Sequence, residues 1–170
     1  MALRRHHRHD HPSPVRYQLR EKLISVGDDY WIEDGAGQRA FKVDGKALRV
    51  RDTWVLKDPS GHEVAKIKEH KLSVRDTIKI DLDSGDATVK KALVGIRDRF
   101  HVDVDKGDDL KIHGNVVDHE YEIERDRTTI ATVSKRWFRV RDTYGVEVAD
   151  PADAPLVLAV TVAIDSMTHD

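Results

Sequence analysis

One stretch of this chain decides how the rest must fold: PLVLAVTVAIDSM, running from Pro155 to Met167. It is the only long apolar run in a chain in which 35% of the residues are charged. A helix over this run would have no polar face, so it would have to be buried on all sides. The run is also too short to cross a bilayer, which takes about 20 apolar residues. The rest of the chain must therefore enclose it.

The residues of the run leave its secondary structure open. Several of them are β-branched, which disfavours a helix and favours a buried strand; they are Val157, Val160, Thr161, Val162 and Ile164. Asp153 as an N-cap, with Pro155 just inside the first turn, favours a helix. On these residues alone, helix and strand are about equally supported.

The chain that precedes the run repeats itself. The marker Val-Arg-Asp-Thr, followed by an aromatic or apolar residue, occurs at Val50–Thr53, Val74–Thr77 and Val140–Thr143, with looser copies around Asp28 and Asp98. The same spacing of 24 residues separates Asp28 from Asp52 and Asp52 from Asp76. A fixed period of this length indicates a repeated supersecondary unit. Because the Arg-Asp pair recurs in each unit, we interpret it as a structural corner in which the Asp bonds the backbone.

Each unit has the pattern of a β-hairpin. Alternating apolar and polar residues, as in Ile78–Leu82, are typical of a half-buried strand. A cluster of Asp and Gly, as in Asp58–Gly61, then predicts a turn, and a second alternating segment follows. About a dozen such strands, each with one apolar face, would form a curved antiparallel sheet that closes into a barrel and leaves no exposed edge. The apolar run would lie inside that barrel.

Composition excludes several classes of function. The 29 basic and 31 acidic residues give a net charge of −2, which argues against a nucleic-acid partner. The absence of Cys rules out disulfides, thiol nucleophiles and Cys-ligated metals, and it suits a reducing cytoplasm. Residues 1–14 have no apolar stretch after their arginines, so we do not expect them to act as a secretory signal. We interpret them as a flexible His/Arg-rich tail and weigh metal binding by its histidines as a weaker alternative.

Motifs for catalysis or metal binding are missing from the sequence. No Gly-x-Ser-x-Gly nucleophile elbow is present. Asp103–Asp109 resembles a calcium loop, but Gly107 falls at position five rather than six, so a hairpin turn is the better interpretation. His119-Glu120 lacks the second His of a zinc-protease motif. The remaining isolated histidines have no ligand spacing; they are His62, His70, His101 and His113. We therefore predict no enzymatic activity, no metal and no cofactor.

Several segments, taken in order, resemble the LURP-one-related (LOR) family, over about residues 15–167. They are Glu21–Tyr30, the Lys-x-Leu-x-Val-x-Asp units, Gly114–Ile123, Val133–Val146 and Leu158–Asp165. The family is similar to tubby C-terminal domains and phospholipid scramblases. The resemblance implies a mainly β fold: a closed barrel of about twelve antiparallel strands around a central hydrophobic C-terminal helix at about residues 154–167. Residues 15–170 would form this one domain.

The resemblance implies a binding module rather than an enzyme. Tubby domains bind phosphoinositides, but their headgroup residues have no recognisable counterpart here, and a palmitoylated Cys segment of the scramblase type cannot exist without Cys. The candidate contacts to phospholipid headgroups are basic residues in three clusters: Lys66, Lys68 and Lys71; Lys90 and Lys91; Lys135 and Arg136. A solvated surface of mixed charge is the better interpretation of these clusters, because the net charge is near zero. We expect a cytoplasmic protein with no transmembrane segment, either peripheral at the inner membrane surface through anionic lipid or acting as a protein-interaction scaffold.

Overall fold

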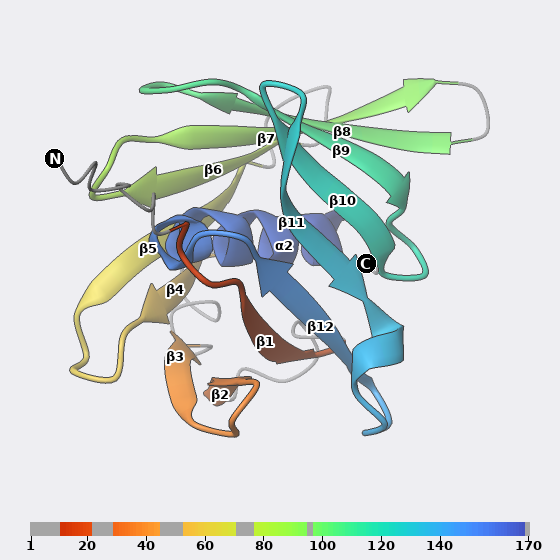
Figure 1. Ribbon diagram of the computed structural model, residues 1–170. Helices are drawn as coiled ribbons and strands as arrows, with labels where there is room; N and C mark the ends of the chain where they lie inside the picture. Colours follow the sequence, from red (N-terminus) through yellow and green to blue (C-terminus); the bar gives the residue numbers. More distant parts are fainter. Residues whose placement is uncertain (1–10, 22–28, 45–52, 71–76, 95–96, 169–170) are drawn as a thin grey trace, which may run out of the picture.

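The computed structural model describes residues 11–21, 29–44, 53–70, 77–94 and 97–168. This part of the chain contains twelve strands, two short 3-10 helices (η1 and η2) and one α-helix, α2 (Figure 1). The strands are β1 (Val15–Arg20), β2 (Tyr30–Asp34), β3 (Arg39–Asp44), β4 (Thr53–Lys57), β5 (Glu63–His70), β6 (Thr77–Leu82), β7 (Ala87–Val94), β8 (Arg97–Val104), β9 (Leu110–Asn115), β10 (Glu120–Arg125), β11 (Thr128–Ser134) and β12 (Thr143–Val148). The helices are η1 (Lys135–Trp137), η2 (Pro151–Asp153) and α2 (Ala154–Thr168).

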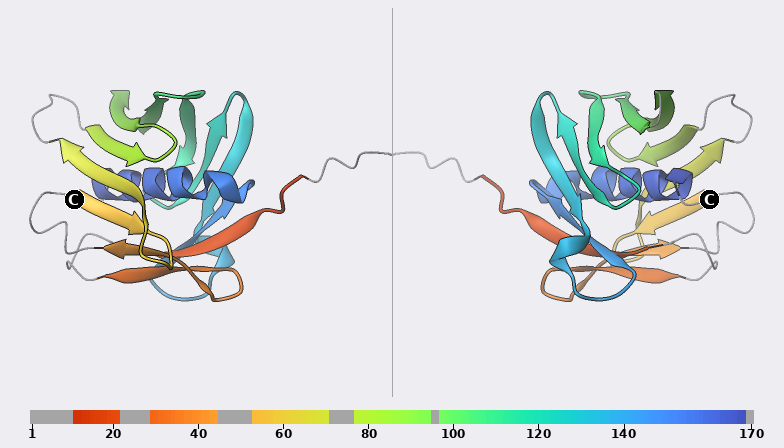
Figure 2. Two further views of the ribbon diagram at one scale, coloured as in Figure 1. Left: turned by 90° about the vertical axis from the view of Figure 1, so that its left-hand side faces the viewer. Right: turned by 90° about the vertical axis from the view of Figure 1, so that its right-hand side faces the viewer.

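The twelve strands form one closed antiparallel barrel, as predicted. Each strand pairs with its neighbours in the chain, and β1 closes the circle by pairing with β12 from Val15–Val148 to Arg20–Thr143. Closure gives both edges of the sheet a partner, which removes the exposed edges that promote aggregation. Figure 2 shows the strands passing around α2 on its different sides.

Short hairpin turns at one end of the barrel are held by Asp side chains and contain Gly, as the sequence predicts. The Asp58 carboxylate accepts hydrogen bonds from the backbone N–H groups of Ser60 and His62, at 2.9 and 3.0 Å. Asp34 makes the equivalent bonds in the preceding hairpin. Gly61 has a φ of 90°, a conformation that L side chains rarely adopt. The repeated Asp and Gly residues of the sequence therefore correspond to turns with the same hydrogen-bonding geometry.

The corner marked by Val-Arg-Asp-Thr is described in one copy, Val140–Thr143; the Arg-Asp pairs at 51–52 and 75–76 lie outside the described residues. Asp142 has a φ of 58°, and its carbonyl accepts a 2.8 Å hydrogen bond from the Glu21 N–H. The Thr143 hydroxyl donates to the Val140 carbonyl at 2.7 Å. We expected the Asp side chain to hold this bend; the side-chain bond that holds it comes from Thr143.

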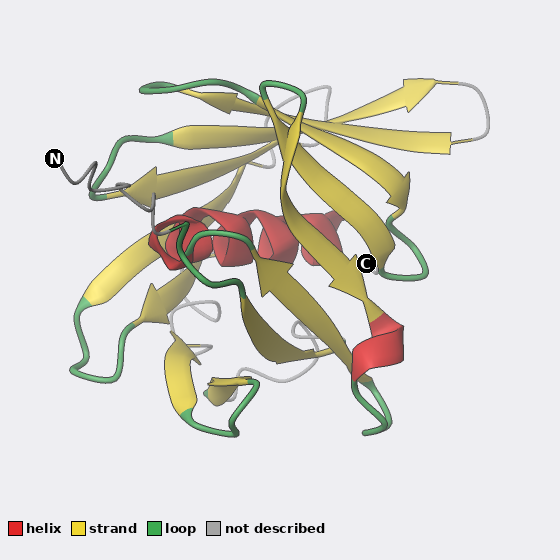
Figure 3. Ribbon diagram, viewed as in Figure 1, coloured by secondary structure: helices red, strands yellow, loops and turns green. Residues whose placement is uncertain are grey.

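The apolar run forms α2, which lies inside the barrel (Figure 3). Every residue from Val157 to Ser166 is buried, so no face of the helix meets water. Barrel closure explains why a run rich in β-branched residues is helical. A closed sheet offers no edge for another strand, whereas a helix satisfies its backbone hydrogen bonds internally. Among the described residues, no helix combines the length and apolar character needed to cross a bilayer.

Candidate functional site

A cavity of about 480 Å³ opens at the end of the barrel where α2 begins. The β6–β7 and β8–β9 turns line it, together with the end of β10 and the segment from Ala152 to Leu156. Its volume falls within the roughly 300–1,000 Å³ range of small-molecule sites. We take this mouth cavity as the candidate binding site.

The wall of the mouth cavity is apolar. Val64, Leu82, Val104 and Leu156 line it, and each is only partly buried although it packs against the barrel core. Leu82 and Val104 continue the inward-facing alternation of β6 and β8, whereas Val64 lies at the bulge in the β4–β5 pairing and Leu156 lies in the first turn of α2. A ligand with an apolar portion would gain free energy by covering them.

The segment that leads into α2 is fixed by polar contacts beside the cavity. Asp150 caps η2 by accepting a 2.9 Å hydrogen bond from the Ala152 N–H, and Pro151 follows it. Asp153 forms a bidentate pair with Arg125, at 3.1 and 2.9 Å. The sequence predicts Asp153 as the N-cap of the long helix, but both of its carboxylate oxygens accept hydrogen bonds from the Arg125 guanidinium. The capping contact observed in this segment is made by Asp150, which caps η2. This pair fastens the entry of α2 to the end of β10.

Charges of both signs surround the cavity. Lys106, Asp108 and Asp83 line it alongside the Arg125–Asp153 pair. The His62 Nε2 atom lies 3.0 Å from Asp83 Oδ2, and this contact raises the pKa of His62. An apolar wall with a mixed-charge rim suits an amphipathic molecule better than a simple anion. The residues that line the cavity include no histidine and no pair able to activate Ser84 as a nucleophile.

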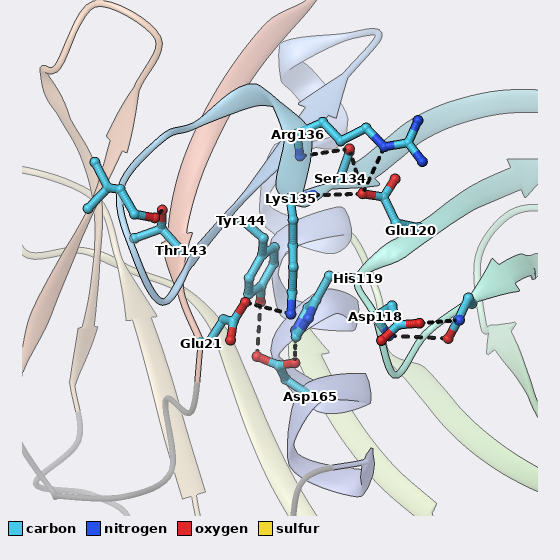
Figure 4. Close-up of polar contacts among 12 residues, drawn as sticks. Glu21, Asp118, His119, Glu120, Ser134, Lys135, Arg136, Thr143, Tyr144 and Asp165 are labelled. Atoms are coloured by element: carbon cyan, nitrogen blue, oxygen red, sulfur yellow. Dashed lines mark hydrogen bonds and ion pairs between the residues drawn. The ribbon is translucent and has the colours of Figure 1, made fainter.

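A buried polar cluster lies toward the other end of α2 (Figure 4). The His119 Nε2 atom lies 2.6 Å from Asp165 Oδ1, and the Tyr144 hydroxyl donates to Asp165 Oδ2 at 3.1 Å. The His119 and Tyr144 rings stack with their centroids 4.2 Å apart. The cluster thus joins α2 to β12 and to the turn before β10.

This His–Asp–Tyr group resembles a catalytic constellation, but its burial indicates a structural role. The side chains of His119 and Asp165 are 2% and 5% exposed, and neither residue lines the mouth cavity. Burial, with Asp165 as the second cause, raises the pKa of Tyr144 well above its ordinary value, so this tyrosine stays protonated. The contacts anchor α2 to the barrel wall.

Sequence reasoning missed this cluster. His119 lies in the β9–β10 turn with a φ of 53°, and no motif in the sequence marks it as the partner of a buried carboxylate. The available signal was Asp165, a single carboxylate at the end of an otherwise apolar run. A buried carboxylate needs hydrogen-bonding partners, so its position predicts some partner on the barrel wall without saying which one.

The basic residues proposed as headgroup contacts are spread over the barrel, and those that the structure describes are engaged with other groups. Lys71 lies outside the described residues. The others pair as Lys66–Glu63, Lys68–Asp81, Lys90–Asp103, Lys135–Glu21 and Arg136–Glu120, while Lys91 donates to the Met167 carbonyl. The described candidates therefore lie on β5, β7 and η1, and each one contacts a carboxylate or a backbone carbonyl.

The fold defines the class of protein: a twelve-strand antiparallel barrel around one buried helix, which fits the tubby-like fold. The chain matches the LURP-one-related (LOR) family over residues 15–165, and it belongs to this family. A crystal structure of a protein from Arabidopsis thaliana has a similar fold, with a TM-score of 0.68, 19% sequence identity and 93% of each chain covered. At that identity the likeness shows the fold alone. No curated protein matches the chain.

Proposed function

We propose that the chain is a non-enzymatic binding module whose mouth cavity holds one amphipathic, lipid-like molecule. The observation that carries this proposal is the partly exposed apolar wall formed by Val64, Leu82, Val104 and Leu156 around a cavity of about 480 Å³. Partly exposed apolar side chains around a concave site favour a ligand with a hydrocarbon portion.

The charged residues around the mouth cavity determine which polar group of a ligand can bind there. Arg125 is neutralised by Asp153, so the cavity is lined by one further cation, Lys106, and by Asp83 and Asp108. A zwitterionic headgroup can approach Lys106 through its anionic part and the carboxylates through its cationic part. A single-chain lipid with a zwitterionic head, such as a lysophosphatidylcholine, is the ligand class that this chemistry favours.

A titration with a fluorescent single-chain lysophosphatidylcholine tests the proposal on the full chain. We expect saturable binding of one molecule per chain and competition by the unlabelled lipid. Val64→Trp, which fills the cavity, should weaken binding at least tenfold. Val117→Trp is the matched control because Val117 is exposed in the β9–β10 turn, away from the cavity. Equal affinity of the two folded variants, or no saturable binding by the unmodified chain, would contradict the proposal.

Recruitment to anionic membranes through surface lysines is the other lipid-based candidate. Pairing of five of the six described candidates with carboxylates weakens it, because a paired ammonium contributes less to attraction by an anionic surface. A scaffold without a small ligand is the third candidate, supported by the mixed surface charge. For each of these three candidate functions we propose that the protein acts in the cytoplasm.

A further inference from the structure

We propose that His101, Asp103 and Asp109 form a binding site for one divalent transition-metal ion of the zinc class on the outside of the barrel. His101 and Asp103 lie two residues apart on β8, so their side chains share the outer face of the strand. Asp109 comes from the turn between β8 and β9 and approaches the same imidazole. The site is independent of the lipid-like ligand proposed above.

The spacing of the three ligand atoms fits one metal ion. His101 Nε2 lies 3.0 Å from Asp103 Oδ1 and 3.5 Å from Asp109 Oδ2, and the three ligand atoms all lie within 4.8 Å of one another. Zinc binds imidazole nitrogen and carboxylate oxygen at about 2.0–2.2 Å. Two ligands at that radius are about 3 Å apart in octahedral geometry and about 3.4 Å apart in tetrahedral geometry. Small side-chain rotations would bring all three onto one ion.

Contacts outside the trio position both carboxylates. Lys90 donates to Asp103 Oδ2, which leaves Oδ1 facing the imidazole. The Val104 N–H donates to Asp109 Oδ1 at 2.9 Å, which leaves Oδ2 facing it. Hydrogen bonds of this kind orient ligands in established metal sites.

The donor set selects the kind of metal. One imidazole nitrogen and two carboxylates suit zinc and its first-row neighbours, with water completing the coordination. Calcium requires six to eight oxygen ligands and is disfavoured by an imidazole donor. Lys90 on β7 and Lys111 on β9 lie opposite His101. Their positive charges repel a metal cation, so they will reduce the affinity of the site for zinc. We therefore expect a site that binds zinc measurably and does not retain calcium.

The test must separate this site from the histidines near the start of the chain. In the full chain, His6, His7, His9 and His11 are replaced by Ala to give the background protein. Isothermal titration with ZnCl₂ should then give one site per chain. His101→Ala and Asp109→Asn should each weaken zinc binding at least tenfold, because each removes one of the three ligands.

Two controls make the outcome decisive. His113→Ala removes another exposed histidine, which faces Glu124 on a different strand pair, and it should leave zinc affinity unchanged. Cooperative melting of each variant checks that it is folded. The proposal is overturned if the background protein binds no zinc at millimolar concentration, if His101→Ala binds as the background does, or if calcium binds equally well.

Discussion

Asp165 is the one buried carboxylate among the described residues. It places a carboxylate inside an apolar core, where an unpaired charge would be strongly unfavourable. His119 and Tyr144 offset that cost by occupying both oxygens. The same contacts also fix how α2 is rotated within the barrel, since only one face of the helix carries this group.

Removing the carboxylate gives the first prediction. Asp165→Ala leaves His119 and Tyr144 buried without their shared acceptor, so the free energy of unfolding should fall by about 3–5 kcal/mol. Urea denaturation followed by circular dichroism measures the change. Asp105→Ala, at an exposed turn position, should shift the unfolding free energy by less than about 0.5 kcal/mol. Similar losses in the two variants would contradict the anchoring role of the cluster.

Alkaline pH gives the second prediction. Burial raises the pKa of Tyr30, Tyr121 and Tyr144 in the folded state. Above the ordinary tyrosine pKa of about 10, the folded chain keeps these protons and the unfolded chain loses them. Stability is therefore fully present below that pH and falls as pH rises. Urea denaturation at pH 8 and at about pH 11 should show this loss, and Tyr144→Phe should make the loss smaller. An unfolding free energy that is the same at pH 8 and at about pH 11 would contradict the contribution of the buried tyrosines.

At the scale of strands, Gly114 allows β9 and β10 to approach closely where it faces Tyr121. A Cβ atom there would lie 2.6 Å from the Glu120 carbonyl oxygen and 2.8 Å from the Tyr121 Cα atom. Both of these are backbone atoms of β10, so a larger residue could be accommodated only by moving the strand. Gly114 also has a φ of 123°.

Gly114→Ala should therefore lower the free energy of unfolding by about 3 kcal/mol or more, because backbone strain and the clash act together. Gly37→Ala is the control that isolates the strain, since Gly37 has a φ of 77° and open space around it. Its expected loss is about 1 kcal/mol. Thermal melts of the two variants compare them directly, and equal losses would mean that the close approach of β9 and β10 is unimportant.

The central helix gives the fourth prediction. Val160→Asp or Val162→Asp would place an unpaired charge inside the barrel, so neither variant should fold. Val117→Asp is the matched control, because Val117 is 54% exposed and an aspartate there stays in water. Yield of soluble protein and a cooperative melt are the measurements. A stable, cooperatively melting Val160→Asp variant would be incompatible with a helix enclosed by the sheet.

The elements were predictable from the sequence to the extent that they depend on local pattern. Alternation in segments such as Ile78–Leu82 predicted strands, and Asp58–Gly61 predicted the turn chemistry. The helical state of Val157–Ile164 was not decided by these residues, because barrel closure overrides their β propensity. The mouth cavity and the contact between His119 and Asp165 join residues far apart in the chain, and a single sequence does not report which distant residues meet.

For the molecule as a whole, surface charge decides how the barrel meets a membrane. The net charge of −2 and the pairing of Lys68 and Lys90 with Asp81 and Asp103 leave little excess positive potential in the described part. We predict that flotation with anionic liposomes will not exceed flotation with neutral liposomes at low salt. Asp81→Asn, which releases Lys68, should increase binding to anionic vesicles. Strong salt-sensitive flotation of the unmodified chain would instead favour recruitment through the lysines.

The order of the elements has a consequence for biosynthesis. The ribosome makes all twelve strands before it makes α2, and the seam between β1 and β12 joins residues from opposite ends of the barrel sequence. A nascent chain that has reached β11 therefore has an unsealed sheet and an unfilled interior. Stable folding must wait until translation has passed residue 168, and until then the cell's chaperones face an open sheet with two unpaired edges and an uncovered apolar face.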